Sequence, residues 1–220
     1  MSKRDDALKA VQQNGFAILG LSADLQNDKK IALAAVQQNG LLLFALSVNL
    51  QNNKDIALAA VQQNGFAFCW VSQALKSDKE VVLAAAGQPG FELDKVGEPL
   101  KNDRDIALAA VNQDGLALWG LSADLQNDKK IALAAVQQNG LALWGLSERL
   151  KNDRDIAVAA VKQNKLALEY VSQDLLKQHS DIFGSVRTSQ NPSSLWFISG
   201  ENGGSDPNHL TGGRNFGHGP

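Results

Sequence analysis

The side chains most capable of chemistry are charged residues that recur in short turns. Two of these turns read Asn-Asp-Arg-Asp, at residues 102–105 and 152–155. Closely spaced aspartates can bind calcium, but the spacing and the glycine of an EF-hand loop are missing here. Helix capping and contact with water therefore explain these turns better, and we expect no metal site in them.

Histidine and cysteine give no stronger signal. His179, His209 and His218 have no Glu or Cys at metal-ligand spacing. Cys69 lies in an apolar run, which favours a buried small residue over a nucleophile. The sequence contains no phosphate-binding loop, dinucleotide fingerprint or Gly-x-Ser-x-Gly elbow. We expect no catalytic residue, no metal and no cofactor, and therefore a protein that is not an enzyme.

Composition restricts the class of protein further. The 220 residues carry 21 basic and 23 acidic side chains, and this balance argues against nucleic acid as a partner. A single cysteine excludes an internal disulfide framework. The N-terminus has no apolar core of a secretion signal, and the apolar runs are too short to cross a membrane. We expect an intracellular protein, cytoplasmic or organellar, without a transmembrane segment.

The elements that position these residues form a repeat of 25 residues. Glycine recurs at this spacing six times, and Lys165 occupies the seventh place; the glycines are Gly15, Gly40, Gly65, Gly90, Gly115 and Gly140. Residues 20–40 recur unchanged as residues 120–140, which indicates a duplicated block. Seven copies cover residues 3–178 without insertion, so one structural unit is stacked on copies of itself.

Each copy predicts a helix followed by a shorter one. In residues 28–52, Asn27 or Asp28 caps a helix with six consecutive apolar residues, and Gly40 acts as a left-handed stop. In the fourth copy, Ser77 and Glu80 form the pattern of a capping box. A leucine-rich repeat has a similar period, but the apolar positions of its signature are not filled.

These patterns predict an all-α fold. We expect an α-solenoid of seven 25-residue helix–turn–short-helix repeats over residues 1–179, followed by an irregular, Gly/Ser-rich extended tail over residues 180–220. The fourth copy carries Pro89 and Pro99. Because proline disrupts helical hydrogen bonding, we expect a shortened helix there and a change of curvature that divides the array into two arms.

Large aromatic residues gather at two neighbouring positions of the repeat. They are Trp70, Trp119, Trp144 and Tyr170, in a ridge that also includes Leu19 and Phe44. Aromatic side chains are favoured at interfaces, which makes them candidates for partner binding. The competing interpretation is packing between copies, because a bulky residue at the first position is accompanied by a small one at the second.

The phrase from Asn102 to Leu118, which recurs in phase, resembles the repeat of the family known as domain of unknown function 4116. The resemblance covers about four-fifths of the chain. It implies a helical repeat fold, and it supplies no catalytic residue. The family occurs in bacterial and protist proteins, often as long arrays, and the resemblance therefore favours binding over catalysis.

The tail adds one apolar cluster: Leu195, Trp196, Phe197 and Ile198. We expect this cluster to cover the last helix pair or to bind a partner. The leading hypothesis is a non-catalytic protein–protein interaction scaffold, a peripheral subunit of a larger assembly, with another protein as its partner. Two alternatives remain open.

The first alternative is a bacterial effector-type binding module. The second is binding of a small molecule or a peptide in the solenoid groove. A groove ligand would need polar groups that converge on it, and the candidates are the paired amides Gln37, Gln38, Gln62, Gln63, Gln137 and Gln138.

Overall fold

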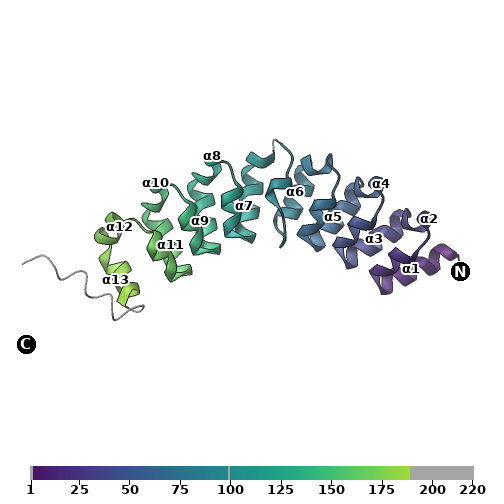
Figure 1. The fold of residues 1–220 in the computed structure, drawn as a ribbon, viewed down its shortest axis with the longest axis horizontal. Coiled ribbons are helices and arrows are strands. Elements are labelled where there is room, and N and C mark those ends of the chain that lie inside the picture. The colour runs from purple at the N-terminus through teal and green to yellow at the C-terminus, as the bar shows by residue number, and fades with distance from the viewer. Residues whose placement is uncertain (1, 99, 189–220) are drawn as a thin grey trace, which may run out of the picture. The chain divides into compact units, whose positions relative to one another are not determined.

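The structure, a computed structural model, describes residues 2–98 and 100–188. The chain forms two compact units, Met1–Ser180 and Asp181–Pro220. We call the first unit the array. Its longer helices, the main helices, lie side by side in sequence order (Figure 1). They are α1 (Lys3–Gln13), α3 (Lys29–Gln38), α5 (Lys54–Gln63), α6 (Lys79–Ala86), α7 (Arg104–Gln113), α9 (Lys129–Gln138) and α11 (Arg154–Gln163).

The described residues contain helices and no strand, so the predicted all-α repeat is confirmed. The first copy spans residues 3–27 and each later copy starts 25 residues further on, so the fourth is 78–102 and the seventh 153–177. Each main helix contributes its apolar residues to the contacts with neighbouring copies. In α3, Ile31, Ala32, Ala35 and Val36 are fully buried, whereas Leu33 is half-buried.

An aspartate starts most main helices. The carboxylate of Asp28 accepts hydrogen bonds from the backbone N–H groups of Lys30 and Ile31, at 2.9 and 3.2 Å. Asp78 caps α6 in the same way, so the expected capping box of Ser77 and Glu80 is not formed. A capping box does occur at the start of α1, between Ser2 and Asp5.

Outside the fourth copy, the shorter part of each copy is two helices rather than one. A six-residue 3-10 helix comes first, and a short α-helix follows it except in the third copy. The six-residue 3-10 helices are η1 (Gly15–Gly20), η2 (Gly40–Ala45), η3 (Gly65–Trp70), η7 (Gly115–Gly120), η8 (Gly140–Gly145) and η9 (Lys165–Tyr170). The short α-helices are α2 (Ala23–Gln26), α4 (Val48–Gln51), α8 (Ala123–Gln126), α10 (Glu148–Lys151) and α12 (Gln173–Gln178). Helices α2, α4, α8 and α10 follow one edge of the row (Figure 1).

Asparagine, rather than glycine, ends most of the main helices. Asn39 has an extended backbone (φ −147°), and its side-chain oxygen accepts a hydrogen bond from Leu41 N at 3.0 Å, which starts the 3-10 helix. The expected left-handed stop at Gly40 is wrong, because Gly90 is the one described glycine with a positive φ. A Cβ on Gly40 would lie 2.2 Å from the carbonyl oxygen of Ala60. Glycine is therefore required because the next copy approaches so closely.

The fourth copy departs from the regular pattern. Helix α6 has eight residues and ends at Ala86, which confirms the expected shortening. After α6, the chain forms only two short 3-10 helices, η5 (Leu93–Lys95) and η6 (Leu100–Asn102). A similar short 3-10 helix, η4 (Leu75–Ser77), ends the third copy. Residues 1–180 form one compact unit and α6 continues the row (Figure 1), whereas the expected change of curvature that divides the array into two arms stays a prediction.

Helix α13 (Ser180–Thr188) begins at the last residue of the array. An irregular segment was expected from residue 180 onward, so that expectation is wrong for these nine residues. The apolar cluster Leu195, Trp196, Phe197 and Ile198 lies outside the described residues.

Candidate interaction surface

The 3-10 helices carry exposed aromatic side chains. Trp119 in η7 is 46% exposed and Trp144 in η8 is 57% exposed. Their ring centroids lie 5.4 Å apart and the rings meet edge to face, at 74°. This geometry is favourable for aromatic pairs. Two candidates from neighbouring copies are thus brought together, and about half of each ring remains open to contact.

Packing between copies explains part of this arrangement. A Cβ on Gly145 would lie 2.2 Å from Nε1 of Trp119, so the indole ring lies directly over that glycine. Packing between copies, which the alternation of bulky and small residues predicted, is therefore confirmed where the fifth copy meets the sixth. Trp119 both packs on the next copy and presents its outer half to solvent.

A second aromatic pair occurs nearer the N-terminus. Trp70 in η3 is 40% exposed, and its ring centroid lies 6.1 Å from that of Phe44 in η2. Tyr170 is half-buried at the position equivalent to Trp70. We call these residues, with Leu19, the aromatic ridge: Leu19, Phe44, Trp70, Trp119, Trp144 and Tyr170.

Other exposed apolar side chains, not predicted from the sequence, lie on the 3-10 helices and on α4. These are Phe16, Val48, Phe66 and Leu166. Phe16, Phe66 and Leu166 all follow directly after the position of the repeating glycine. The 25-residue period that identified the ridge could therefore have identified this second row.

The fourth copy interrupts the ridge with charge. Asp94 and Lys95 occupy the two ridge positions there, and the ammonium of Lys95 lies 3.1 Å from the carboxylate of Asp94. The hydrogen bond to Asp94 raises the pKa of Lys95. Lys95 also lies 3.7 Å from Glu92. The apolar ridge is thus separated into one part on copies one to three and another on copies five to seven.

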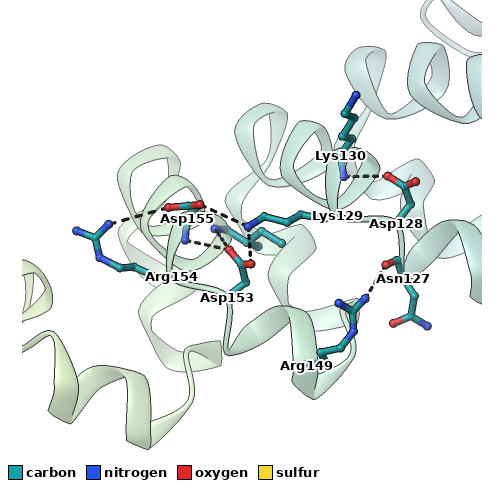
Figure 2. A network of polar contacts seen from close by, with 9 residues as sticks. Asn127, Asp128, Lys129, Lys130, Arg149, Asp153, Arg154 and Asp155 are labelled. Atoms are coloured by element: carbon teal, nitrogen blue, oxygen red, sulfur yellow. Dashed lines mark hydrogen bonds and ion pairs between the residues drawn. The ribbon is translucent and has the colours of Figure 1, made fainter.

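Charged residues at the starts of the main helices form a ladder along the array. The basic residue at the start of one main helix pairs with the capping aspartate of the next, at 2.6–2.8 Å: Arg4–Asp28, Lys54–Asp78, Lys79–Asp103, Arg104–Asp128 and Lys129–Asp153. Figure 2 shows one rung, where Lys129 reaches both Asp153 and Asp155. The third copy has Asn53 at the cap, and Lys29 pairs with Asp55 instead.

The ladder neutralises its own charges. The guanidinium of Arg4 donates a hydrogen bond to Asp28 and holds the pKa of that carboxyl below its usual value. Lys54 and Lys79 lower the pKa values of Asp78 and Asp103 by the same contact. These side chains are partly open to water, so each pair stabilises the fold only weakly. The aspartate turns noted in the sequence thus serve in capping and in pairing between copies.

The repeated glutamines form a clamp between copies. The side-chain oxygen of Gln163 accepts a hydrogen bond from Gly140 N at 2.6 Å, and its amide nitrogen donates to the carbonyl of Gln138 at 3.0 Å. The side-chain oxygens of Gln38, Gln63 and Gln138 likewise accept from the backbone N–H of the repeating glycine in the preceding copy. This half of the candidate ligand-binding amides is therefore engaged within the array.

The other half faces outward on the main helices. Gln37, Gln62 and Gln137 are exposed. Gln137 lines a shallow groove of about 590 Å³ between α9 and α11, together with Leu133, Val158 and Lys162. The groove alternative therefore retains a physical location.

Cys69 is half-buried, and burial raises the pKa of its thiol, which disfavours the reactive thiolate. Within residues 2–98 and 100–188, no group of three His, Cys, Asp or Glu side chains is placed to hold a metal ion. No helix in the same residues is long and apolar enough to cross a membrane.

Comparison with known proteins agrees with the repeat. The model of the family described as Domain of unknown function (DUF4116) matches residues 3–51, 40–76, 78–126 and 128–176. Three matches start at residues 3, 78 and 128, so their offsets of 75 and 50 are multiples of 25, and each spans two copies. No curated protein and no solved structure matches the chain. The chain belongs to the DUF4116 family.

Proposed function

We propose that this chain is a non-catalytic protein–protein interaction scaffold that binds its partner through the aromatic ridge. The observation that carries the proposal is the half-exposed pair of Trp119 and Trp144 on the 3-10 layer. Tryptophan is enriched among the residues that dominate binding energy at interfaces. Gly145 and the neighbouring copies hold the ring of Trp119 in place, so little side-chain entropy is lost when a partner covers it.

The polar residues of the array support a structural role for the helices that carry the aromatic ridge. Aspartates cap helices, cations pair with them, and glutamines join consecutive copies. We propose that the scaffold is a peripheral subunit of a larger assembly within the cell, with another protein and not nucleic acid as its partner. The balanced charge and the lone cysteine support this proposal.

The test compares two variants of the full chain as affinity baits in lysate of the source organism. The first is Trp119→Glu with Trp144→Glu, which introduces the residue that the seventh copy carries at this position, Glu169. The second is Gln37→Ala with Gln62→Ala and Gln137→Ala, which alters the main-helix face. Thermal unfolding monitored by circular dichroism confirms that both variants are folded.

If the ridge binds the partner, the tryptophan variant loses co-isolated proteins that the parent chain and the glutamine variant retain. Loss in the glutamine variant alone would favour ligand binding in the groove. Equal recovery from all three chains would contradict the proposed scaffold.

A further inference from the structure

A cleft of about 550 Å³ lies between the fourth and fifth copies, at the interruption of the ridge. One wall comes from the segment that follows α6, including Gln88, Phe91 and Asp94. The other wall comes from the end of α7 and from η7, including Gln113 and Asp114. The cleft lies wholly within the array, and neither Trp119 nor Trp144 is among its lining residues.

The glutamine clamp is open at this cleft. Four joints between copies have the hydrogen bond from the repeating glycine to the next glutamine. In the described residues, the joints on either side of the fourth copy do not have it, and the side-chain amides of Gln88 and Gln113 make no hydrogen bond. Both residues are half-buried, and each amide lines the cleft without a hydrogen-bond partner among the described residues.

The walls between these amides are apolar. Leu93 is 9% exposed, and Phe91, Leu116 and Ala117 are half-buried. The ring of Phe91 is fixed from behind by the ring of Phe68, with centroids 5.3 Å apart. An aliphatic or planar group that enters the cleft would therefore meet a preformed apolar surface.

The charge in the cleft is negative. Asp94 and Asp114 line it, and no lysine or arginine does. Asp94 already contacts Lys95, whereas no ion pair within the described residues involves Asp114. Asp114 is also the one aspartate at a position where five other copies have asparagine: Asn14, Asn39, Asn64, Asn139 and Asn164.

Capping does not account for this carboxylate. The side chain of Asp114 accepts from Leu116 N at 2.9 Å, and that of Asn139 accepts from Leu141 N at 3.1 Å. An asparagine would thus make the same cap without a charge. The single copy that replaces it with a carboxylate is the one that faces the open cleft.

We propose that this cleft binds an arginine side chain presented by a partner protein. The aliphatic stem lies against Phe91 and Leu116, and the guanidinium donates hydrogen bonds to the carboxylate of Asp114 and to the amide oxygen of Gln113. Arginine suits the site better than lysine because its planar group offers several donors in fixed directions and packs on aromatic rings. This inference rests on the proposed binding of a protein partner, but not on the ridge as the site.

The test titrates the isotope-labelled full chain with the peptide acetyl-Gly-Arg-Gly-amide and follows the side-chain amide signals by NMR. The matched peptide contains citrulline, which has nearly the shape of arginine but no charge. We expect the arginine peptide to shift the side-chain amide signals of Gln113 and Gln88, and to leave the indole signals of Trp119 and Trp144 unchanged. The citrulline peptide should bind about tenfold more weakly.

Asp114→Asn should weaken the binding of the arginine peptide by the same factor. The thermal stability of this variant should match that of the parent chain, because five copies already carry asparagine there. Asn139→Asp is the control, since it places a carboxylate at a joint that the clamp closes, and it should create no new binding. Equal binding of the two peptides, unchanged affinity in Asp114→Asn, or the absence of a saturable shift would each overturn the proposal. The affinity experiment with the tryptophan variant tests the aromatic ridge, and its result does not depend on the outcome of this titration.

Discussion

At the scale of the residue, the joints between copies depend on a glycine and a glutamine that act together. At the joint between the sixth and seventh copies, Gly140 lets the carbonyl of Ala160 approach, and Gln163 joins Gly140 N to the carbonyl of Gln138. The glutamine thus satisfies a donor and an acceptor at helix ends that would otherwise lack partners. Lys165 replaces the glycine in the seventh copy, after which the sequence contains no eighth repeat of the pattern.

This arrangement predicts a large difference between two glycine substitutions. Gly140→Ala places a methyl group 2.3 Å from the carbonyl oxygen of Ala160, and backbone cannot move aside easily. We expect a loss of about 1–3 kcal/mol in the free energy of unfolding, measured by urea denaturation. Gly20→Ala is the control, because nothing lies within 4 Å of the added methyl group and the second copy already has Ala45 there. Equal stability of the two variants would contradict the close-approach explanation.

The ion-pair ladder predicts sensitivity to acid. Hydrogen bonds from Lys54 and Lys79 keep the pKa values of Asp78 and Asp103 lower in the folded than in the unfolded chain. The unfolded chain therefore binds more protons at pH values between the two, so the stabilisation is complete above the unfolded value, about 3.9, and is lost as pH falls through the folded value. We expect the Tm to fall below about pH 4.

A variant isolates the contribution of these carboxylates to acid sensitivity. Asp78→Asn with Asp103→Asn retains helix caps, as Asn53 does naturally by accepting from Ile56 N at 3.3 Å. It should have a lower Tm at pH 7 and a shallower decline from pH 7 to pH 3 than the parent chain. Parallel curves would show that other groups cause the acid sensitivity.

At the scale of the element, the sequence predicted the main helices well and the segments after them less well. Six apolar residues after an aspartate cap identify a buried helix such as α3, and the structure confirms it. The 3-10 helix was not foreseen, because the signal for it is Asn39, whose side chain caps the following turn. The sequence predicted a left-handed stop at Gly40 instead, since glycine after a helix commonly adopts a left-handed conformation. Distinguishing these roles requires the position of the next copy, which local sequence does not contain.

The candidate surface was predicted in part for a similar reason. Alternation of bulky and small residues suggested packing, and the aromatic types suggested binding, but one copy alone cannot show that Trp119 does both. The cleft was not predicted at all. The glutamine clamp is open there, which the local sequence does not show, although Pro89 and Asp114 mark the place in the sequence.

The fourth copy should be the least protected element of the array. Its main helix is two residues shorter than its neighbours, and the glutamine clamp is open at both of its joints within the described residues. Hydrogen–deuterium exchange measured by mass spectrometry should therefore be faster in α6 and residues 87–98 than in α9 and residues 137–148. Uniform exchange across the copies would contradict this expectation.

A consensus variant tests the cause of the faster exchange. Gly87→Gln with Pro89→Asn restores the Gln-Gln-Asn-Gly sequence that ends four of the other main helices, such as α9. Helix α6 should then extend by two residues and exchange more slowly, because the clamp to Gly65 can form. If the variant exchanges as fast as the parent chain, the missing clamp does not explain the local opening.

At the scale of the whole molecule, the array is two similar blocks on either side of the fourth copy. Residues 20–40 and 120–140 are identical, and the aromatic pair Phe44 and Trp70 corresponds to Trp144 and Tyr170 at an offset of 100 residues. Each copy contacts mainly its neighbours, so stability is approximately a sum over copies and joints. The contacts at one regular joint are equivalent to those at the next, and one copy can therefore replace another.

Removal of one complete copy should consequently leave a folded, shorter array. Deletion of residues 129–153 joins Asp128 to Arg154, so Asp128 can cap α11 as it capped α9 and still pair with Arg104. Gln163 can then clamp Gly115 in place of Gln138, and Ala160 can replace Ala135 beside that glycine. Circular dichroism should show unchanged helicity per residue and a cooperative transition at lower Tm. Deletion of only residues 129–141 removes fewer residues but separates a 3-10 helix from its main helix, so it should destabilise the array more. A half-copy deletion that is the more stable of the two would contradict the equivalence of the joints.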